Sequence, residues 1–599
     1  MAIIGDGSAG ALMYRSIGYE PLVRWDPGWK RVVPNVAQAI TVNSEATEYT
    51  VQLREGMRWS DGHPFTTDDI MFWAERILPD PALTSPSIRE VFSIDGALGQ
   101  FERRGPFVFR VTFPVPNGLF LQKLASGTPT ASITDYPRHR LAPLFRDGDP
   151  KAIAQAIAET GAKDWRAMFE VKSRRFNTRA DPALVFRTGI EGRQVALAND
   201  YKPWPTLDAW VPVAMEDGDP PRIIAKRNPY YWKIDPAGRQ LPYIDSVAFH
   251  LVPGSPDAKS WEMMDRLILT DEIDMQLERI WHAAKSMPPK EPTPNLRLIP
   301  AMDAGGNALP LALNLTHPDL VKRRLFQDLG FRIALSQAID RRRIMTEILQ
   351  NNSQVYERPY QMAPRPESRF FHERLAFQHL AFDPAKSNRL LDELGLIRRD
   401  DQGFRRDETG RRLTIEVLVR SEKTGQRAML ARIVEDWKAV GIEVVVKPIP
   451  RRELSDVAIP GAAYDAVVTF DDGGMEAMME PANYVPTRER SWFAPAWKTW
   501  FIDRNDPRAE EPPQGVRDQM ALYATLQKTV DPEAQDELMR RILDIAADQF
   551  YMMGIALAGA EPGIAKKTMR NLPPYFVEAF IYPTPAPTNP SQYFFEAPR

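Results

Sequence analysis

Two adjacent carboxylates and a group of tryptophans are the residues of this sequence best suited to bind a polar ligand. Asp471 and Asp472 directly follow YDAVVTF, whose apolar run predicts a strand, and Trp492, Trp497 and Trp500 come shortly after them. In α/β proteins, ligands bind off the carboxyl ends of strands. A carboxylate there can accept hydrogen bonds from sugar hydroxyls or pair with the terminal amine of a peptide, and an indole ring offers a flat apolar face to a pyranose.

Stacking on an indole ring could supply much of the affinity for such a ligand. Half-burying one ring removes about 80–100 Å² of surface, worth about 2 kcal/mol. Two stacks would give about half of the roughly 8 kcal/mol that micromolar binding requires. The other interpretation is that WFAPAWKTWF, 492–501, is a loop that packs its aromatic residues into the core. The pattern favours at least one tryptophan at the ligand and leaves open which one.

Composition excludes several classes of function. The 599 residues exceed a single core, so two or three lobes are expected. A formal net charge of −3 gives no basic surface for nucleic acid, and no apolar run is long enough to span a membrane. The absence of cysteine excludes disulfides and thiolate metal sites, and the seven histidines show no metal-ligand spacing. We therefore expect no cofactor, no metal and no nucleic-acid partner.

One glycine pattern near the start of the chain matches the motif of dinucleotide-binding sites. Gly5, Gly7 and Gly10 spell GxGxxG after the short apolar run AII. A dinucleotide site needs a full strand before this pattern, a helix after it and an acidic residue at the end of a second strand. The sequence continues instead into the turn-rich YEPLVRWDPGW, which disfavours the nucleotide interpretation. No charged start followed by a long apolar core is visible, so we expect no signal peptide in this sequence.

The segment ATEYTVQLREGMRWSDGHPFTTDD, 46–69, combines a strand, two turns and a helix start. Its YTVQL alternates apolar and polar residues, as in a half-buried strand. Thr66 or Thr67 can cap the helix that follows, and the two aspartates after them suit a helix start. This segment closely resembles the signature segment of the solute-binding proteins of ABC importers, in the dipeptide/oligopeptide-binding family (family 5, cluster C).

Further motifs carry the same resemblance. Y-E-x-L followed by P-N-x-A is matched between Tyr19 and Ala37, and the family loop NPYYW is present at 228–232. A family helix pattern is present almost intact at Phe326, Asp328, Arg332, Ala334, Ala338, Ile339, Asp340 and Arg341. The extension DPAGRQLPYID, 235–245, is similar to that of the branch whose members bind oligosaccharides. This last similarity is an indirect reason to prefer sugar over peptide.

The resemblance implies an α/β fold of the two-lobed periplasmic-binding-protein type II class, with an extra subdomain in lobe I. We expect lobe I at 1–295, lobe II at 296–550 and a C-terminal return to lobe I at 551–599, with the proline-rich segment 285–295 as a linker. In lobe II, apolar periodicity predicts one long amphipathic helix at 325–349. The segments LTIEVLV, QRAMLARIVEDWKAVG and IEVVVKPI predict a β-α-β unit with parallel strands.

The resemblance also adds candidate ligand-binding residues. In relatives, the segment that holds Tyr19 and Glu20 lines the cleft between the lobes, and Trp25 follows in the same segment. Asn314 belongs to PLALNLTH, which resembles the strand that opens the second lobe. The candidate ligand-binding residues are therefore Tyr19, Glu20, Trp25, Asn314, Asp471, Asp472, Trp492 and Trp497. An equally weighted alternative for Tyr19 and Glu20 is a buried tyrosine beside a glutamate that pairs with an arginine.

By this resemblance the protein is an extracytoplasmic, periplasmic solute-binding protein and not an enzyme. It would capture an oligosaccharide, an α-galactoside or a similar di- or trisaccharide, between its lobes. It would act as a monomer that delivers the sugar to the transmembrane subunits of an ABC permease. Two alternatives stay open. One is an oligopeptide-binding protein of the same family, and the other is a glycosidase that uses two carboxylates, although no pair can be singled out among 79 acidic residues.

Overall fold

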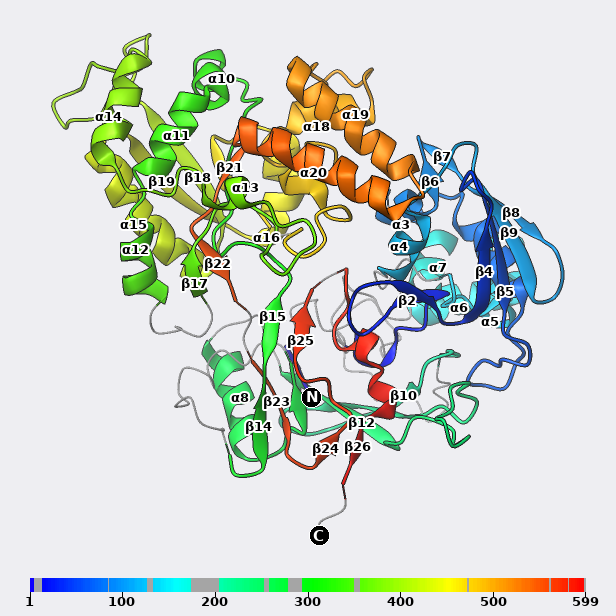
Figure 1. The fold of residues 1–599 in the computed structure, drawn as a ribbon. Coiled ribbons are helices and arrows are strands. Elements are labelled where there is room, and N and C mark those ends of the chain that lie inside the picture. Colours follow the sequence, from blue (N-terminus) through cyan, green and yellow to red (C-terminus); the bar gives the residue numbers. More distant parts are fainter. Residues whose placement is uncertain are drawn as a thin grey trace. The chain divides into compact units, whose positions relative to one another are not determined.

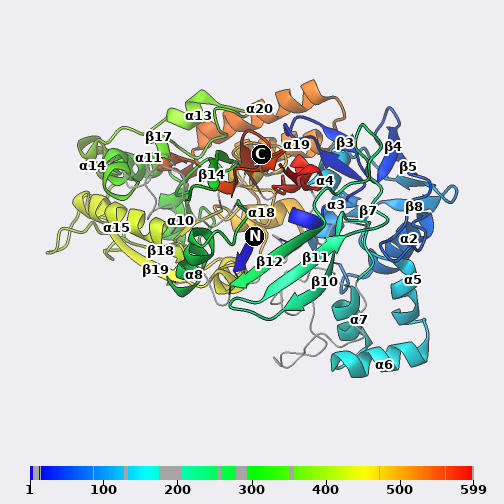
Figure 2. The same ribbon diagram turned by 90° about the horizontal axis from the view of Figure 1, so that it is seen from below.

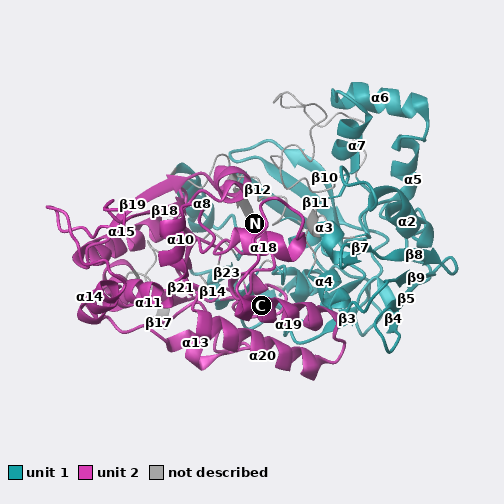
Figure 3. Cartoon of the chain, turned by 90° about the horizontal axis from the view of Figure 1, so that it is seen from above, with its two compact units in different colours: residues 1–302, 561–599 teal, residues 303–560 magenta. Residues whose placement is uncertain are grey.

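The computed structural model describes residues 1–4, 13, 15–84, 86–126, 133–173, 204–252, 258–277, 293–349, 356–470, 473–559, 562–579 and 581–596. The chain forms two compact units, which Figure 3 colours separately. Unit 1 consists of Met1–Met302 and Glu561–Arg599, and unit 2 of Asp303–Ala560. The second boundary falls beyond position 550 because a strand that follows this position still pairs within unit 2.

Unit 1 contains an antiparallel sheet built around the segment 46–69. Its strand order is β4-β5-β9-β8 (Figure 1). The strands are β4 (Ala37–Val42), β5 (Glu48–Leu53), β9 (Val108–Thr112) and β8 (Gln100–Arg103). The predicted strand is confirmed, because Tyr49, Val51 and Leu53 are buried while the residues between them are more exposed.

The predicted helix start is confirmed at Thr66, the N-cap of α2 (Thr67–Phe72). The Thr66 hydroxyl accepts a hydrogen bond from the Asp68 backbone N–H at 3.2 Å, and the Asp69 carboxylate accepts one from the Thr66 N–H at 3.1 Å. This reciprocal arrangement satisfies N–H groups that the first turn of a helix leaves unpaired. Helical winding then continues through one wider turn, Trp73–Ile77.

A second sheet of unit 1 has the order β1-β12-β11-β10, and Figure 2 shows its last three strands side by side. The strands are β1 (Ala2–Ile4), β12 (Ser246–Val252), β11 (Arg222–Arg227) and β10 (Trp210–Glu216). Ile223 and Phe249 of this sheet are fully buried and belong to one apolar cluster. Gly5, Gly7 and Gly10 of the glycine pattern lie outside the described residues.

The C-terminal segment belongs to unit 1. Its strand β23 (Gly563–Lys566) pairs with both β13 (Met275–Gln276) and β14 (Leu296–Ile299). Further along, Arg24 Nη2 donates to the Ala586 carbonyl at 2.6 Å. The proline-rich tail therefore packs on unit 1. The expected linker 285–295 lies almost entirely outside the described residues.

Unit 2 is built on a five-stranded sheet in the order β19-β18-β20-β16-β21. The strands are β19 (Glu443–Ile449), β18 (Thr414–Arg420), β20 (Ala466–Val468), β16 (Leu311–Leu313) and β21 (Met552–Met553). The predicted β-α-β unit is confirmed, because β18 and β19 are parallel and α15 (Thr424–Ala439) connects them. β20 is parallel to β18, whereas β16 is antiparallel to its neighbours β20 and β21. Helices α19 (Gln514–Lys528) and α20 (Pro532–Gln549) lie side by side (Figure 1).

The prediction of one long helix at 325–349 is wrong. The chain forms α10 (Leu320–Gln327), α11 (Leu329–Gln337) and α12 (Arg341–Ile344), followed by one wider turn, Met345–Leu349. Asp328 accepts from the Phe331 N–H and starts α11, and Asp340 accepts from the Arg343 N–H and starts α12. An aspartate that bonds nearby N–H groups offers the backbone an alternative to continued helix.

Two arginines of the predicted helix pattern are buried and donate to backbone carbonyls. Arg341 donates to Ser336 and Gly554, each at 2.8 Å. Arg332 donates to the Gln549 carbonyl at 2.7 Å. Burial lowers the pKa of Arg341 to about 9 and that of Arg332 to about 10. These bonds tie the α11 region to the chain that precedes and follows β21.

Across the part of the chain that the structure describes, no helix combines the length and apolarity needed to cross a membrane. The same part contains no group of three or more His, Asp or Glu side chains placed to hold a metal ion.

Candidate functional site

The carboxyl ends of three parallel strands meet at one edge of the unit 2 sheet. Arg420, the last residue of β18, is in register with Ile449, the last residue of β19, and β20 runs parallel beside β18. Phe470 follows the end of β20 and Arg451 follows the end of β19. Ligands of α/β sheets bind at such an edge. We call it the Phe470 edge.

The Phe470 ring is the aromatic centre of this edge. It is partly exposed, and its backbone carbonyl accepts a hydrogen bond from Asn483 Nδ2 at 3.1 Å. The guanidinium carbons of Arg420, Arg451 and Arg490 lie 4.6, 5.6 and 4.7 Å from the ring centroid. These separations are typical of cation–π contacts. The Phe470 edge therefore combines an apolar ring with three groups that can donate hydrogen bonds to ligand oxygen atoms.

Trp492 lies at the Phe470 edge but is buried. Its ring is 5.2 Å from the Phe470 ring, with an angle of 60° between them. It is only 5% exposed, and its backbone carbonyl accepts a hydrogen bond from the Tyr464 hydroxyl. Trp492 thus supports the Phe470 ring from inside the unit and does not present an open face.

The other two tryptophans of this segment lie on α18 (Pro495–Ile502). Trp497 is 3% exposed, and its indole N–H has no hydrogen-bond partner among the described residues. Trp500 is partly exposed, and the Arg504 guanidinium carbon lies 4.3 Å from its ring centroid. Trp497 therefore packs into unit 2, as the core-packing interpretation predicts, but this part of the segment is a helix and not a loop.

Asn314 lies at the opposite edge of the same sheet. Because β16 is antiparallel to β20, the chain that follows β16 lies beside the start of β20, away from Phe470. Asn314 is fully buried, and its Nδ2 donates to the carbonyls of Ala462 and Tyr464 at 2.9 and 3.2 Å. Its Oδ1 accepts from the Thr316 N–H at 3.1 Å. These bonds occupy its amide within unit 2, and the structure does not bring it together with the Phe470 edge.

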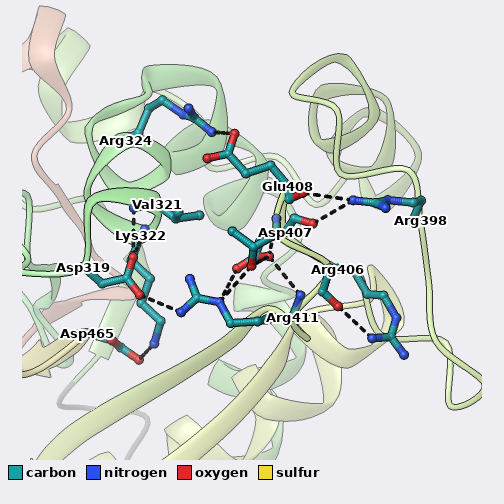
Figure 4. Close-up of polar contacts among 12 residues, drawn as sticks. Asp319, Val321, Lys322, Arg324, Arg398, Arg406, Asp407, Glu408, Arg411 and Asp465 are labelled. Atoms are coloured by element: carbon teal, nitrogen blue, oxygen red, sulfur yellow. Dashed lines mark hydrogen bonds and ion pairs between the residues drawn. The ribbon is translucent and has the colours of Figure 1, made fainter.

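Ion pairs cover this opposite edge. Asp465 accepts from Lys322 Nζ at 2.6 Å and contacts His317 Nε2 at 3.0 Å. Burial alone would raise the pKa of Asp465, but these hydrogen bonds outweigh it and hold the pKa below its ordinary value. Figure 4 shows the pair of Lys322 with Asp465 and, beside it, the pair of Arg411 with Asp319 at 3.1 Å. The charged groups here are engaged with one another.

In unit 1, Tyr19 and Glu20 are both buried. The Tyr19 hydroxyl donates to a backbone carbonyl. The Glu20 carboxylate accepts from Asn35 Nδ2 at 2.9 Å, from the Tyr231 hydroxyl at 2.7 Å and from Lys233 Nζ at 2.8 Å. These contacts match the alternative interpretation of a buried glutamate with a cation, except that the cation is a lysine.

Cations and a small cavity surround this glutamate. The Arg54 guanidinium carbon and Lys233 Nζ each lie 4.9 Å from the Trp232 ring centroid. Burial lowers the pKa of Lys233 to about 8, although the charge of Glu20 opposes the shift. The cavity beside Glu20 and Lys233 measures about 20 Å³, which is about the space of one water molecule. A pyranose ring does not fit in this cavity.

Trp25 belongs to the core of unit 1. It ends β2 (Val23–Trp25), which pairs with β3 (Val32–Pro34). The ring is 4% exposed and lies 6.4 Å from the Trp29 ring in an edge-to-face arrangement. Its indole N–H, like that of Trp497, has no hydrogen-bond partner within the described part of the chain.

The residues that make the Phe470 edge are missing from the sequence-based candidates. They are Phe470, Arg420, Arg451 and Arg490. The first three each stand at or just after the end of a strand that the sequence predicts, in VVTF, VLVR and VKPIPR. Their shared position at the ends of predicted strands is the signal by which the sequence could have identified them. Asp471 and Asp472, which follow in the sequence, lie outside the described residues, and their role stays a prediction.

Comparison with families of known proteins finds one match along most of the chain. The model of the bacterial extracellular solute-binding proteins, family 5, matches residues 31–488. A periplasmic alpha-galactoside-binding protein of Rhizobium meliloti (strain 1021) is 24% identical over 582 residues, which cover 92% of this chain and 73% of that protein.

Solved structures resemble the chain over almost its whole length. The oligopeptide-binding protein OppA gives a TM-score of 0.73 with 26% identity, covering 100% of this chain and 90% of that one. The periplasmic binding protein MelB from Agrobacterium fabrum C58, solved in complex with stachyose, gives a TM-score of 0.66 with 20% identity, covering 98% of this chain and 81% of that one.

Proposed function

The chain belongs to the bacterial extracellular solute-binding proteins of family 5, and from this premise we propose that it captures a solute outside the cytoplasm for an ABC importer. The likeness to solved periplasmic binding proteins confirms the predicted two-lobed α/β fold class. Location in the periplasm, action as a monomer, delivery to transmembrane permease subunits and the absence of catalysis are parts of this proposal. The family match along residues 31–488 supports them.

For the solute, the proposal is an oligosaccharide, with an α-galactoside as the first choice. The observation that carries this choice is the similarity to an alpha-galactoside-binding protein over 92% of this chain. The Phe470 edge supports it, because an aromatic ring suits the C–H face of a pyranose and guanidinium groups donate to sugar oxygen atoms. In the sequence, Asp471 and Asp472 directly follow Phe470 and stay candidate hydrogen-bond acceptors.

An oligopeptide is the second candidate. It is favoured by the likeness to an oligopeptide-binding protein at 26% identity over the whole of this chain. A peptide could place its terminal carboxylate against the guanidinium groups of the Phe470 edge, because such pairs form charge-assisted hydrogen bonds. Both candidates use the same edge, so the ligand class has to be decided by binding.

Calorimetric titration separates the candidates. The purified chain is titrated with raffinose and stachyose, with cello-oligosaccharides, and with a mixture of tri- to pentapeptides. We expect saturable heat with the α-galactosides at micromolar concentrations or below. Saturable heat with peptides and none with any sugar would replace it by the peptide candidate. Chromatography of the sugar mixtures checks for released galactose. Its appearance would show hydrolysis and support the glycosidase alternative.

A further inference from the structure

The chain passes from one unit to the other twice, after Met302 and after Ala560. We call two stretches of unit 2 near these points, 304–306 and 556–558, the connecting segments. The second of them is strand β22, and it pairs with β17 (Tyr356–Pro359) of the same unit. Any change in how one unit moves relative to the other has to pass through the backbone beside these two segments.

One buried arginine side chain holds both connecting segments. Arg365 is 2% exposed, and its Nη1 donates to the Gly305 carbonyl at 3.2 Å and also to the Ala558 carbonyl. Its Nε donates to the Glu367 carboxylate at 3.1 Å. A buried carbonyl that loses its hydrogen-bond partner costs free energy. Arg365 therefore anchors two segments that are far apart in the sequence, close to both points where the chain crosses between the units.

The backbone of the same arginine supports the chain that follows Phe470. The Arg365 N–H donates to the Gly474 carbonyl at 2.7 Å. One residue earlier, the Gly473 carbonyl accepts from the Tyr484 hydroxyl at 3.3 Å. The backbone that leaves the Phe470 edge is thus fixed at successive carbonyl groups, and Arg365 supplies one of the donors.

This stretch of chain packs directly on the first connecting segment. The Met475 N–H donates to the Ala304 carbonyl at 2.8 Å. A Cβ on Gly474 would lie 2.4 Å from the Gly305 carbonyl carbon, which is closer than such atoms can approach. Glycine at this position therefore permits the close approach of the two backbones. A shift of the chain after Phe470 would move the first connecting segment with it.

We infer that Arg365 is a positioning residue that fixes both connecting segments against the chain following Phe470, and thereby limits the motion of one unit relative to the other. The inference goes beyond solute capture. It rests on the proposed function in one part only, namely that a solute bound at the Phe470 edge restricts this motion further. Such a solute shifts the range of motion by as much as its affinity differs between the states within that range.

Distances between two labels test the inference. The chain contains no cysteine, so Glu55→Cys in unit 1 and Glu393→Cys in unit 2, both at exposed positions, place one spin label on each unit. Pulsed electron resonance gives the distribution of label distances with and without saturating raffinose. We expect raffinose to narrow this distribution. An unchanged distribution, with saturable heat in calorimetry, overturns the link between binding and motion and leaves the proposed function standing. Absence of heat rejects the proposed sugar, and the width without solute still decides the role of Arg365.

A buried arginine elsewhere in unit 2 supplies the control. Without solute, Arg365→Met should make the distribution about one and a half times as wide, because both connecting segments lose their anchor. Arg365→Lys should restore a narrower distribution, since a single nitrogen reaches both carbonyls and an ammonium has three N–H donors. Arg405 is 1% exposed and donates to the Val440 and Leu396 carbonyls, outside the connecting segments, so Arg405→Met should keep the parent width. Parent width in Arg365→Met, or equal widening in Arg405→Met, overturns the inference.

A second variant leaves the arginine in place. Gly474→Ala brings a Cβ against the Gly305 backbone and should also widen the distribution, because the first connecting segment has to shift. Gly425→Ala, at an exposed position of α15, is the control, since no heavy atom of the described residues would lie within 4 Å of its Cβ apart from its own helix and neighbours. Melting temperatures show that each variant is folded. Parent width in folded Gly474→Ala contradicts the inferred contact between the chain after Phe470 and the motion of the units.

Discussion

In unit 1 the Trp232 ring lies near two cations, Arg54 and Lys233, and in unit 2 the Phe470 ring lies near three guanidinium groups. In unit 1 the buried carboxylate of Glu20 pairs with Lys233 at 2.8 Å. In unit 2 the ring is partly exposed where three parallel strands end. Similar contacts therefore lie in the buried interior of one unit and, on the other, at the edge that we propose as the binding surface. Burial and strand direction distinguish the two roles, and residue type does not.

The largest effect expected from this comparison is on the stability of unit 1. Glu20→Gln leaves Lys233 buried without its anionic partner, and the free energy of unfolding should fall by about 3 kcal/mol, as when one member of a buried ion pair is removed. Urea unfolding followed by tryptophan fluorescence measures this loss. Glu55→Gln, at an exposed turn, is the control and should change stability by less than about 0.5 kcal/mol.

The same variant also tests whether Glu20 contacts the ligand. Its affinity for raffinose, measured by calorimetry on the folded protein, should stay within twofold of the parent value. Unchanged stability together with lost affinity would show that Glu20 is a ligand contact, and would remove the distinction between the two rings.

The next effect is on how the stability of unit 1 depends on pH. In the folded protein the pKa of Lys233 is about 8, below its ordinary value of 10.5. Between these values the unfolded chain still holds a proton that the folded chain has released, so stability from this group rises with pH. The slope approaches at most about 1.4 kcal/mol per pH unit. Urea unfolding of the parent and of Lys233→Met at pH 7, 8, 9 and 10 isolates the contribution of Lys233. If the free energies of unfolding of the two proteins change with pH in parallel, this prediction is wrong.

The smallest effect is on affinity, at the Phe470 edge. Phe470→Ala removes the apolar ring from a partly exposed position and should weaken raffinose binding about tenfold, or about 1.4 kcal/mol. Phe382→Ala removes a ring that is 50% exposed elsewhere in unit 2 and serves as the control. Calorimetry measures both variants. If the two bind sugar alike, within twofold of the parent, the ring at the strand ends is not a binding surface.

Local chemistry explains which parts of the fold could be predicted. The alternation in β5 and the cap at Thr66 each depend on residues that are close together in the sequence. The parallel pairing of β18 with β19 follows from the single helix that connects the two strands. The prediction of one long helix at 325–349 is wrong because the apolar period continues through Asp328 and Asp340, whose side chains cap new helices.

The candidate site was harder to predict because it depends on strand direction. Asn314 and Phe470 both stand next to strand ends in the sequence, but β16 is antiparallel to β20, which places them at opposite edges. That pairing joins residues far apart in the chain and leaves no local signal. Likewise, the aromatic character of Trp492 and Trp497 suggested ligand contact, whereas their burial at 5% and 3% depends on packing that the sequence does not show.

Hydrogen–deuterium exchange of backbone amides, with and without saturating raffinose, tests most directly whether the solute binds at the Phe470 edge. We expect slower exchange in bound protein for peptides that cover 490–493, which include Arg490 and Trp492 beside the Phe470 ring, and a smaller change for those that cover 19–35, around Glu20. Unchanged exchange at 473–493 under saturation, with protection around Glu20 instead, would contradict the assignment.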